Sequence, residues 1–508
     1  MSSRVCFGPL PGRSLITARW IVGHRNGRHC LLPEGELVFE GPRIIFVGHG
    51  FPGPVERRLD FGNAIVGPGF IDLDALADLD TTILAFDNQP EHRTGRVWPR
   101  TYLEAGPYEM YDREELAFQK RYAFARLLRG GITTAAPIAS LFYRAWAETV
   151  EEFEDAAIAA ADLGIRVYLG PAFSSGTAVV ENDGRITMHF DEVRGLEGLR
   201  DAGLFAARME GAHGGLVRGM LAPNRIETCT PGLLDNLRAV AKELDCPVRL
   251  HACQSAFEYE TVMIERGEGP IEWLDRHELL TPRLLIPHLT HVAPSARVKH
   301  SFDDLALLVD RGVSLVHCPL VAARYGDAIN HFARYRALGL NVAMGTDTAP
   351  PDMIRNMQVA LLIGRVLAQD AQAVRAEDLY DAATLGGARA LMRDDLGRLE
   401  AGALADFTVF DLSCPELGQV IDPVQTIMIA GSSHGFTHVA VNGEFRMIGK
   451  KVKEFDEVAG AARAQHQFDR LVSRYPDRTW RHPPVEDTFS SSYPAEPVPV
   501  TQDEPHGG

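Results

Sequence analysis

Hydrophobic residues in the middle of the chain form short, nearly continuous runs that alternate with longer stretches of helical pattern. The runs lie at 65–72, 131–139, 165–173, 216–223, 247–254, 283–290, 313–320 and 341–348. Strands that are buried on both faces lose the alternation of polar and apolar side chains, so these runs read as parallel strands. A helical stretch follows each run, and the pattern predicts an α/β fold with a (β/α)8 barrel over residues 65–397.

Helix end signals support this interpretation. Asp112 and Glu115 predict a capping box, and Thr230 before Pro231 predicts an N-cap with proline in the first turn. A helix is expected over 145–163, before a glycine. The rival architecture is an open doubly wound sheet, which normally carries a glycine-rich phosphate turn. Neither GxGxxG nor GxxxxGK[ST] occurs in the sequence, so we favour the barrel.

The two chain ends have a different pattern of hydrophobic residues from the middle of the chain. Short strand-like runs separated by turn residues occupy 1–64 and return over 398–452. We expect these segments to pair as one small composite β-sandwich domain. Residues 453–508 are expected to form a C-terminal helix followed by an extended tail without periodicity.

Composition narrows the function further. The 508 residues include 51 basic and 68 acidic side chains, a formal charge of −17, which argues against a nucleic-acid or anionic-membrane partner. No apolar stretch is long enough for a transmembrane helix, and the first residues do not resemble a secretory signal. The seven cysteines contain no CxxC pair, so we expect a cytoplasmic protein that acts on a small molecule.

Polar residues follow the ends of several predicted strands: Asp74, His251, Gln254, His288, His317 and Asp347. The carboxyl ends of barrel strands meet at one mouth, where barrel enzymes carry their chemistry. Imidazole and carboxylate ligands from different strands suit a catalytic divalent metal with one position left for water. A single histidine in an apolar run is usually a core residue, but equivalent topological positions favour a shared site.

Three neighbouring features have simpler interpretations beside the functional one. Asp72 reads as a loop-capping carboxylate, and His317 before Cys318 and Pro319 is equally a strand stop. The long segment 73–112 contains Trp98 and several tyrosines, and it is either a lid over the mouth or a surface excursion or dimer contact.

Several of these stretches together resemble a known family. They are IVGPGFID, RGGITTA, LHACQ, LIPHLTHV, LVHCPL, MGTDTAPPDM and LGRLEAGALADFTVFD, and they follow one another over nearly the whole chain. The chain resembles the amidohydrolase superfamily, in particular its cytosine/guanine deaminase and triazine hydrolase branch. The resemblance implies the barrel, hydrolysis of carbon–nitrogen bonds, a divalent metal ion and a homodimer or homotetramer.

The resemblance also shows where the chain departs from the pattern. Relatives of this type carry His-x-His after strand 1, but here the positions read Asp74-Ala75-Leu76. The glutamate expected three residues after the strand-5 histidine is Gln254, which cannot exchange a proton. The histidine and asparagine expected after strands 4 and 7 are Leu221 and Ala322. Glu258, one helical turn beyond Gln254, could approach the same pocket.

The remaining residues define the expected site. His251, Asp347 and Asp74 would hold one Zn, Fe or Mn ion, a set more anionic than the family's. Asp347 would act as the base and His288 would stabilise the oxyanion, while Gln254, His317 and Trp98 would contact the substrate. The expected activity is hydrolysis of a non-peptide carbon–nitrogen bond in an amide, amidine or heterocycle. The alternatives are a catalytically silent binding protein and a metal-independent lyase or isomerase.

Overall fold

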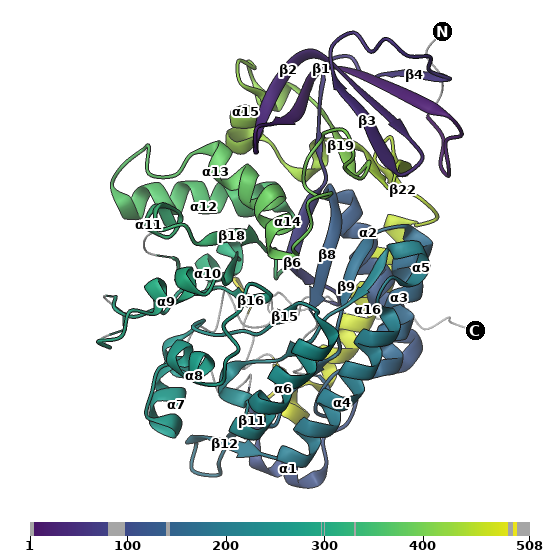
Figure 1. The fold of residues 1–508 in the computed structure, drawn as a ribbon. Helices are drawn as coiled ribbons and strands as arrows, with labels where there is room; N and C mark the ends of the chain where they lie inside the picture. The colour runs from purple at the N-terminus through teal and green to yellow at the C-terminus, as the bar shows by residue number, and fades with distance from the viewer. Residues whose placement is uncertain are drawn as a thin grey trace, which may run out of the picture.

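The computed structural model describes residues 5–79, 97–138, 143–295, 297–298, 300–329, 332–485 and 491–494. A barrel of parallel strands lies beneath a β-domain in which the N-terminal strands meet strands from the last quarter of the chain (Figure 1). Among the described residues, no helix is long and apolar enough to cross a membrane.

The barrel strands are β6 (Phe70–Leu76), β8 (Ile132–Ile138), β9 (Arg166–Leu169), β13 (Val217–Gly219), β15 (Val248–Arg249), β16 (Leu284–Pro287), β17 (Ser314–His317) and β18 (Asn341–Met344). They pair in the order β13-β9-β8-β6-β18-β17-β16-β15, and every pairing is parallel. A bridge between Leu221 and Val248 joins the two ends of this order and closes the ring. The predicted barrel is confirmed.

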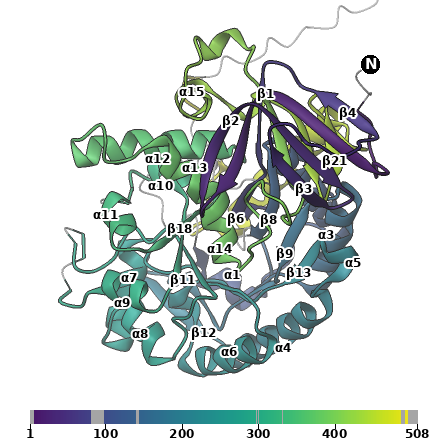
Figure 2. The ribbon, with the colours of Figure 1, turned by 45° about the horizontal axis from the view of Figure 1, so that its top comes forward.

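Helices surround the strands (Figure 2). They are α1 (Arg100–Ala105), α2 (Arg113–Arg129), α3 (Val150–Leu163), α4 (Glu192–Met209), α5 (Ala212–Gly215), α6 (Pro231–Leu244), α7 (Ala256–Arg266), α8 (Pro270–Arg276), α9 (Asp304–Asp310), α10 (Pro319–Arg324), α11 (Phe332–Ala337), α12 (Met353–Ala368), α13 (Ala376–Asp381) and α14 (Gly387–Ala390). The capping box of Asp112 and the Thr230 cap are both present. Helix α3 begins at Val150 rather than residue 145, because Thr149 caps it.

The first apolar run was predicted as a single strand, but it forms two. Strand β5 (Ala64–Pro68) pairs with β1 and β19 in the β-domain, and β6 enters the barrel. The break falls at Gly69, where a Cβ atom would lie 2.1 Å from Thr133 Oγ1. The run is buried throughout because it passes from one core into the next, so hydrophobicity alone could not reveal the break.

The β-domain contains one continuous nine-stranded sheet built from both chain ends. Its strands are β1 (Arg13–Arg25), β2 (Arg28–Glu40), β3 (Arg43–Gly48), β4 (Arg57–Asp60), β5, β19 (Phe407–Asp411), β20 (Phe436–Val441), β21 (Glu444–Ile448) and β22 (Lys451–Val452). Ile16, Leu37, Val66 and Phe407 share its apolar core, so strands from both ends cover the same core. Helix α15 (Pro423–Ala430) lies beside this sheet.

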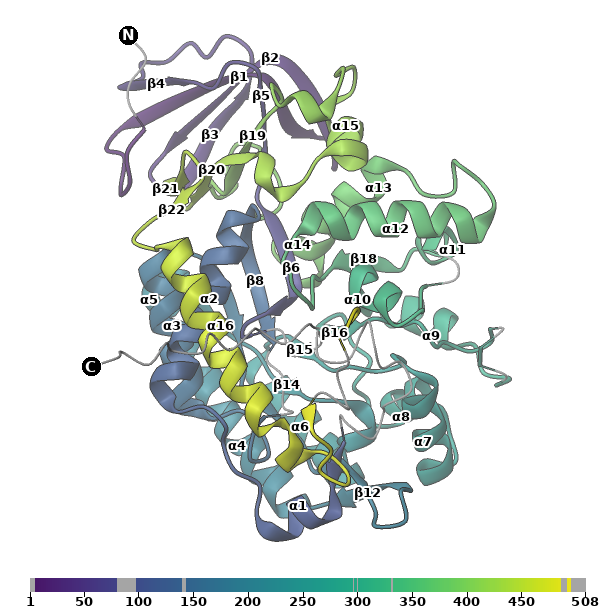
Figure 3. The ribbon, with the colours of Figure 1, turned by 180° about the vertical axis from the view of Figure 1, so that it is seen from behind.

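The C-terminal helix α16 (Glu457–Arg474) runs along the outside of the barrel against α2 (Figure 3). Its buried Gln467 accepts a hydrogen bond from Gln119 at 3.0 Å. Ala464 and Leu471 join a small apolar cluster with Tyr111 and Tyr143. This helix therefore packs against Tyr111, just before α2, and against Tyr143.

Candidate active site

The backbone turns sharply where several barrel strands end. Cys253 after β15, His288 after β16 and Asp347 after β18 have φ angles of 59°, 72° and 53°. L-residues with side chains rarely adopt this left-handed region, and such strain gathers at functional sites, where the surrounding structure holds it. The turns fix the directions of the side chains at the mouth.

Four of the predicted site residues meet at this point. Asp74 Oδ2 lies 3.5 Å from His251 Nε2 and 4.0 Å from His288 Nε2, and His288 Nε2 lies 3.6 Å from Asp347 Oδ2. The Asp347 amide donates to the Asp74 carbonyl at 2.7 Å, which links the ends of β6 and β18. The structure therefore brings together carboxylates and imidazoles from four different strands.

Burial and nearby charges set the protonation of this cluster. Burial alone would raise the pKa of Asp74, but the facing His251 and Arg249 outweigh it and the pKa falls to about 2. Burial, with His251 nearby, lowers the pKa of His288 to about 3. At neutral pH His288 is thus a neutral imidazole beside the Asp74 carboxylate.

The same atoms fit a divalent cation. His251 Nδ1 donates to the Asn224 carbonyl at 3.1 Å, so its Nε2 lone pair faces the Asp74 carboxylate unless a proton or a metal ion lies between them. His288 Nε2 is buried without a hydrogen-bond partner among the described residues. Ligand atoms of Asp74, His288, Cys318 and Asp347 all lie within 4.8 Å of one another. Nitrogen and oxygen donors at this spacing can share one ion.

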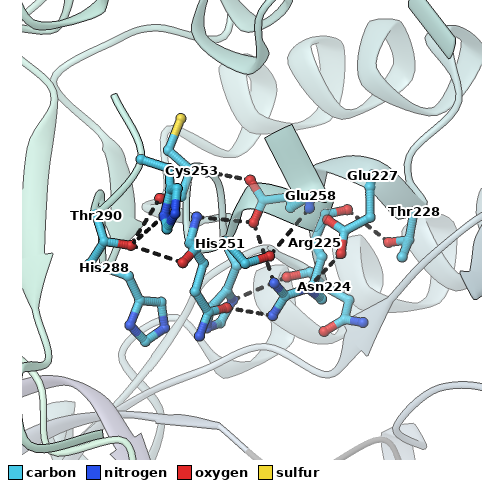
Figure 4. Close-up of polar contacts among 12 residues, drawn as sticks. Asn224, Arg225, Glu227, Thr228, His251, Cys253, Glu258, His288 and Thr290 are labelled. Carbon is cyan, nitrogen blue, oxygen red and sulfur yellow. Dashed lines mark hydrogen bonds and ion pairs between the residues drawn. The ribbon is translucent and has the colours of Figure 1, made fainter. Parts of the chain in front are cut away.

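Arg225, Glu227 and Glu258 form a second polar group beside the cluster (Figure 4), and this group is joined by Gln254. Its Oε1 accepts from Arg225 Nη1 at 2.5 Å. The Arg225 guanidinium also lies 2.8 Å from Glu227 Oε1 and 3.3 Å from Glu258 Oε2. Because Arg225 occupies the amide oxygen, Gln254 keeps its NH2 group as the donor for a further partner.

Glu258 has a structural position in this group. Its carboxylate accepts from the amides of Cys253 and, at 3.1 Å, Gln254, so it holds the strained turn after β15. Burial and neighbouring Glu227 raise the pKa of Glu258 to about 8. The carboxyl group therefore supports the turn and Arg225.

The other predicted residues lie in distinct surroundings. His317 is buried with its ring 5.7 Å from Phe332, and burial lowers the pKa of His317 to about 3. Asp72 caps the turn after β18, because it accepts from the Thr346 amide at 3.0 Å and hydroxyl at 2.6 Å. Burial raises the pKa of Asp72 to about 7.

Trp98 lies outside the barrel ring. It begins β7 (Trp98–Pro99), which pairs with β11 (Gly176–Val180), and its ring packs 5.6 Å from Tyr102 and 6.3 Å from Trp146. Residues 80–96 of the predicted lid lie outside the described residues. The substrate-contacting role of Trp98 stays a prediction.

Sequence reasoning missed Arg225 and Arg249, and it treated Cys318 only as part of a strand stop. Cys318 Sγ lies 3.7 Å from Asp74 Oδ2. Arg249 Nε lies 3.6 Å from Asp74 Oδ1. Arg249 precedes His251 by two residues, so the period of the strand places both side chains on one face. That spacing was a usable signal.

Comparisons with known proteins agree with this architecture. Residues 66–446 match the model of the amidohydrolase family. The chain belongs to the amidohydrolase family. It is 29% identical over 441 residues to a 5-methylthioadenosine/S-adenosylhomocysteine deaminase of Natronomonas pharaonis, with 86% of this chain and 93% of the relative covered. A protein of the same name from Nitratidesulfovibrio vulgaris is 26% identical over 461 residues, covering 88% and 95%.

Solved amidohydrolase structures share the fold. An adenosine deaminase from Xanthomonas campestris with bound zinc superposes with a TM-score of 0.73 at 22% identity, covering 92% of this chain and 100% of that one. Atrazine chlorohydrolase from Arthrobacter aurescens, complexed with zinc, has a TM-score of 0.71 at 19% identity and covers 89% and 99%. At these identities the likeness shows the architecture of the barrel and the added sheet.

Proposed function

We propose that this member of the amidohydrolase family is a hydrolase that cleaves a non-peptide carbon–nitrogen bond of a small molecule with an activated water. The observation that carries the proposal is the convergence of Asp74, His251, His288 and Asp347 at the barrel mouth. Relatives named as deaminases align with most of the chain and support the reaction class.

Each residue has a role that follows from its surroundings. Asp347, on a left-handed turn at the end of β18, accepts the proton of the attacking water. His288 is neutral, so it acts as a hydrogen-bonding group for the developing oxyanion. Gln254, whose oxygen is held by Arg225, donates its amide hydrogens to a carbonyl or ring-nitrogen acceptor of the substrate.

We further propose one divalent ion, Zn, Fe or Mn, held by Asp74, His251 and Asp347. The distance of 3.5 Å between His251 Nε2 and Asp74 Oδ2 supports His251 in this set, and ligand atoms of Asp74 and Asp347 lie within 4.8 Å of each other. When bound, such an ion lowers the pKa of its water towards neutrality. The second carboxylate, where relatives have nitrogen, makes the site harder and favours Mn or Fe over Zn.

The substrate is an amide, an amidine or an aminated heterocycle. We keep His317 and Trp98 as proposed contacts of the substrate. His317 lies at the end of β17, and Trp98 lies just before α1. The decisive experiment incubates metal-supplemented protein with a panel of such compounds and measures ammonia release. Wild type is expected to turn over at least one of them.

Asp347→Asn is the matched inactive variant. Asparagine is tolerated in the left-handed region, so the turn at φ 53° survives while the base is removed. Turnover should fall about 10²–10⁴-fold. Turnover at the wild-type rate would remove the mechanism. A folded wild type that releases no ammonia from any compound would favour the silent binding protein, and ammonia release by metal-free protein would favour an unusual hydrolase that needs no metal.

We propose that the protein forms a homodimer or homotetramer through the outer faces of α12 and α15. Val366 on α12, Ile421 just before α15 and Ile429 on α15 are 74%, 91% and 63% exposed, and Ile429 lines a cavity of about 490 Å³. Arg375 and Asp422 line the same cavity, so the surface offers both charge signs, a hollow and protruding apolar groups to a second copy. Light scattering should give a molecular mass that is two or four times 55.8 kDa, and the Val366→Lys variant should have the mass of a single chain.

A further inference from the structure

Arg249 is a buried cation inside the barrel that no proposed catalytic step uses. It lies on β15, is 3% exposed, and shares a strand face with His251. Its Nη1 donates to the carbonyls of Ala136 and Pro137, at 2.9 and 2.8 Å, on β8. Two main-chain acceptors thus hold the guanidinium at a fixed position beneath the mouth.

The counter-charge of Arg249 is the first carboxylate of the site. Arg249 Nε lies 3.6 Å from Asp74 Oδ1, an atom without a hydrogen-bond partner among the described residues. The other oxygen, Oδ2, faces His251 and His288. One carboxylate is therefore shared between a permanent cation on one side and the imidazole cluster on the other.

This arrangement has two consequences. A guanidinium stays protonated at every physiological pH, so Arg249 neutralises Asp74 whether or not an ion is bound. A divalent cation on Asp74 must also approach a fixed positive charge, and inside a protein that repulsion is strong because few water molecules screen it. The same group that stabilises the carboxylates without metal weakens the binding of metal.

We infer that Arg249 is the resident counter-cation of Asp74 and that it limits the affinity of the site for a divalent ion. The inference rests on the proposed metal site and adds what controls it. Arg249 is a positioning residue, because it acts through Asp74. The site is therefore formed and stable in the metal-free protein, and a bound ion exchanges with solution.

The chain offers a matched control for this inference. Arg166, at the start of β9, is 1% exposed and forms a buried ion pair with Asp406 and a hydrogen bond with Asn442 of the β-domain. It lies at the opposite ends of the strands from the site. Arg166→Met thus removes a buried arginine of the barrel without changing the charge around Asp74.

The experiment measures the dissociation constants of Mn²⁺ and Zn²⁺ by equilibrium dialysis against chelator-stripped protein. Arg249→Met and Arg249→Gln, both neutral, should bind each ion at least about tenfold more tightly than wild type. Glutamine can still donate to a main-chain carbonyl, so it serves if the methionine variant does not fold. Arg249→Lys and Arg166→Met should stay within about threefold of wild type.

Thermal unfolding gives a readout that is independent of catalysis. Metal-free Arg249→Met should melt below wild type, and saturating Mn²⁺ should raise its melting temperature more than that of wild type, because tighter binding stabilises more. Arg166→Met should also melt lower but gain no extra stabilisation from the ion.

The outcomes separate this inference from the proposed function. If wild type binds the ions and both neutral Arg249 variants bind them equally tightly or more weakly, the proposed role of Arg249 is overturned and the metal site still stands. Absence of binding in wild type and in both neutral variants overturns the metal site together with the inference. Binding in the neutral variants alone supports the inference in its strongest form.

Discussion

Replacing Arg225 with methionine tests whether the segments around the mouth depend on the charge of this one side chain. The guanidinium contacts Glu227, Gln254 and Glu258, and its own side chain is 29% exposed. Its two carboxylate partners are 7% and 0% exposed. Methionine fills a similar volume but leaves both carboxyl groups without their cation.

The expected loss follows from the burial of the partners. Removing one member of a buried ion pair typically destabilises a protein by about 3–5 kcal/mol. Glu258 is already mostly protonated at pH 7, since burial raises its pKa to about 8, so mainly Glu227 loses its counter-charge and we expect the lower end, about 3 kcal/mol. Urea unfolding monitored by circular dichroism at pH 7 measures the free energy of unfolding directly.

A surface pair provides the control. Arg283 has nearly the same exposure, 28%, but its partner Asp245 is 75% exposed, so Arg283→Met should cost less than about 1 kcal/mol. If the two substitutions destabilise the protein equally, the burial argument is wrong. A loss below about 1 kcal/mol in Arg225→Met would refute the reasoning on its own.

Three further predictions follow from other contacts. Burial lowers the pKa of His29 from 6.5 to about 3, so the contribution of neutral His29 to stability is present above pH 6.5 and is lost as the pH falls towards 3. Urea unfolding should show that this group makes the protein about 2 kcal/mol less stable at pH 5 than at pH 7. His29→Gln should reduce this dependence of the unfolding free energy on pH. Lys120 lies 2.6 Å from Glu152, and both side chains are 1% exposed, so Glu152→Gln leaves Lys120 without its charge partner. The substitution should lower the free energy of unfolding by about 3–5 kcal/mol in the same assay. A loss under about 1 kcal/mol would count against this prediction. Gly345→Ala places a Cβ atom 2.7 Å from the Cβ atom of Asp74. Equilibrium dialysis should show that the affinity for the metal ion falls roughly 10–100-fold. Unchanged affinity would mean that Asp74 is not a ligand.

The barrel could be predicted because its strands are buried on both faces and therefore stand out as apolar runs. The capping residues Asp112 and Thr230 could be predicted for a local reason, since the cap and the amide it binds are three residues apart. The division between β5 and β6 could not, because both sides of Gly69 are equally buried. The two strands differ in their partners, since β5 pairs with β1 and β19 while β6 pairs with β8 and β18, and these contacts are distant in sequence.

The site was predictable in part for the same kind of reason. His251, His288 and Asp347 follow strand ends, and the barrel brings all strand ends to one mouth. The contact of Arg225 with Glu258, on α7, joins residues 33 positions apart, which no local pattern encodes. Arg249 went unnoticed because only residues after the strands were considered, while its side chain points inward from within one.

The central claim is that one divalent ion binds between Asp74, His251 and Asp347 at the barrel mouth. Crystals grown with Mn²⁺ and measured at a wavelength where manganese scatters anomalously test it directly. The account predicts one strong anomalous peak about 2.0–2.3 Å from a carboxylate oxygen of each aspartate and from Nε2 of His251. A peak elsewhere in the molecule, or none at saturating Mn²⁺, would contradict it.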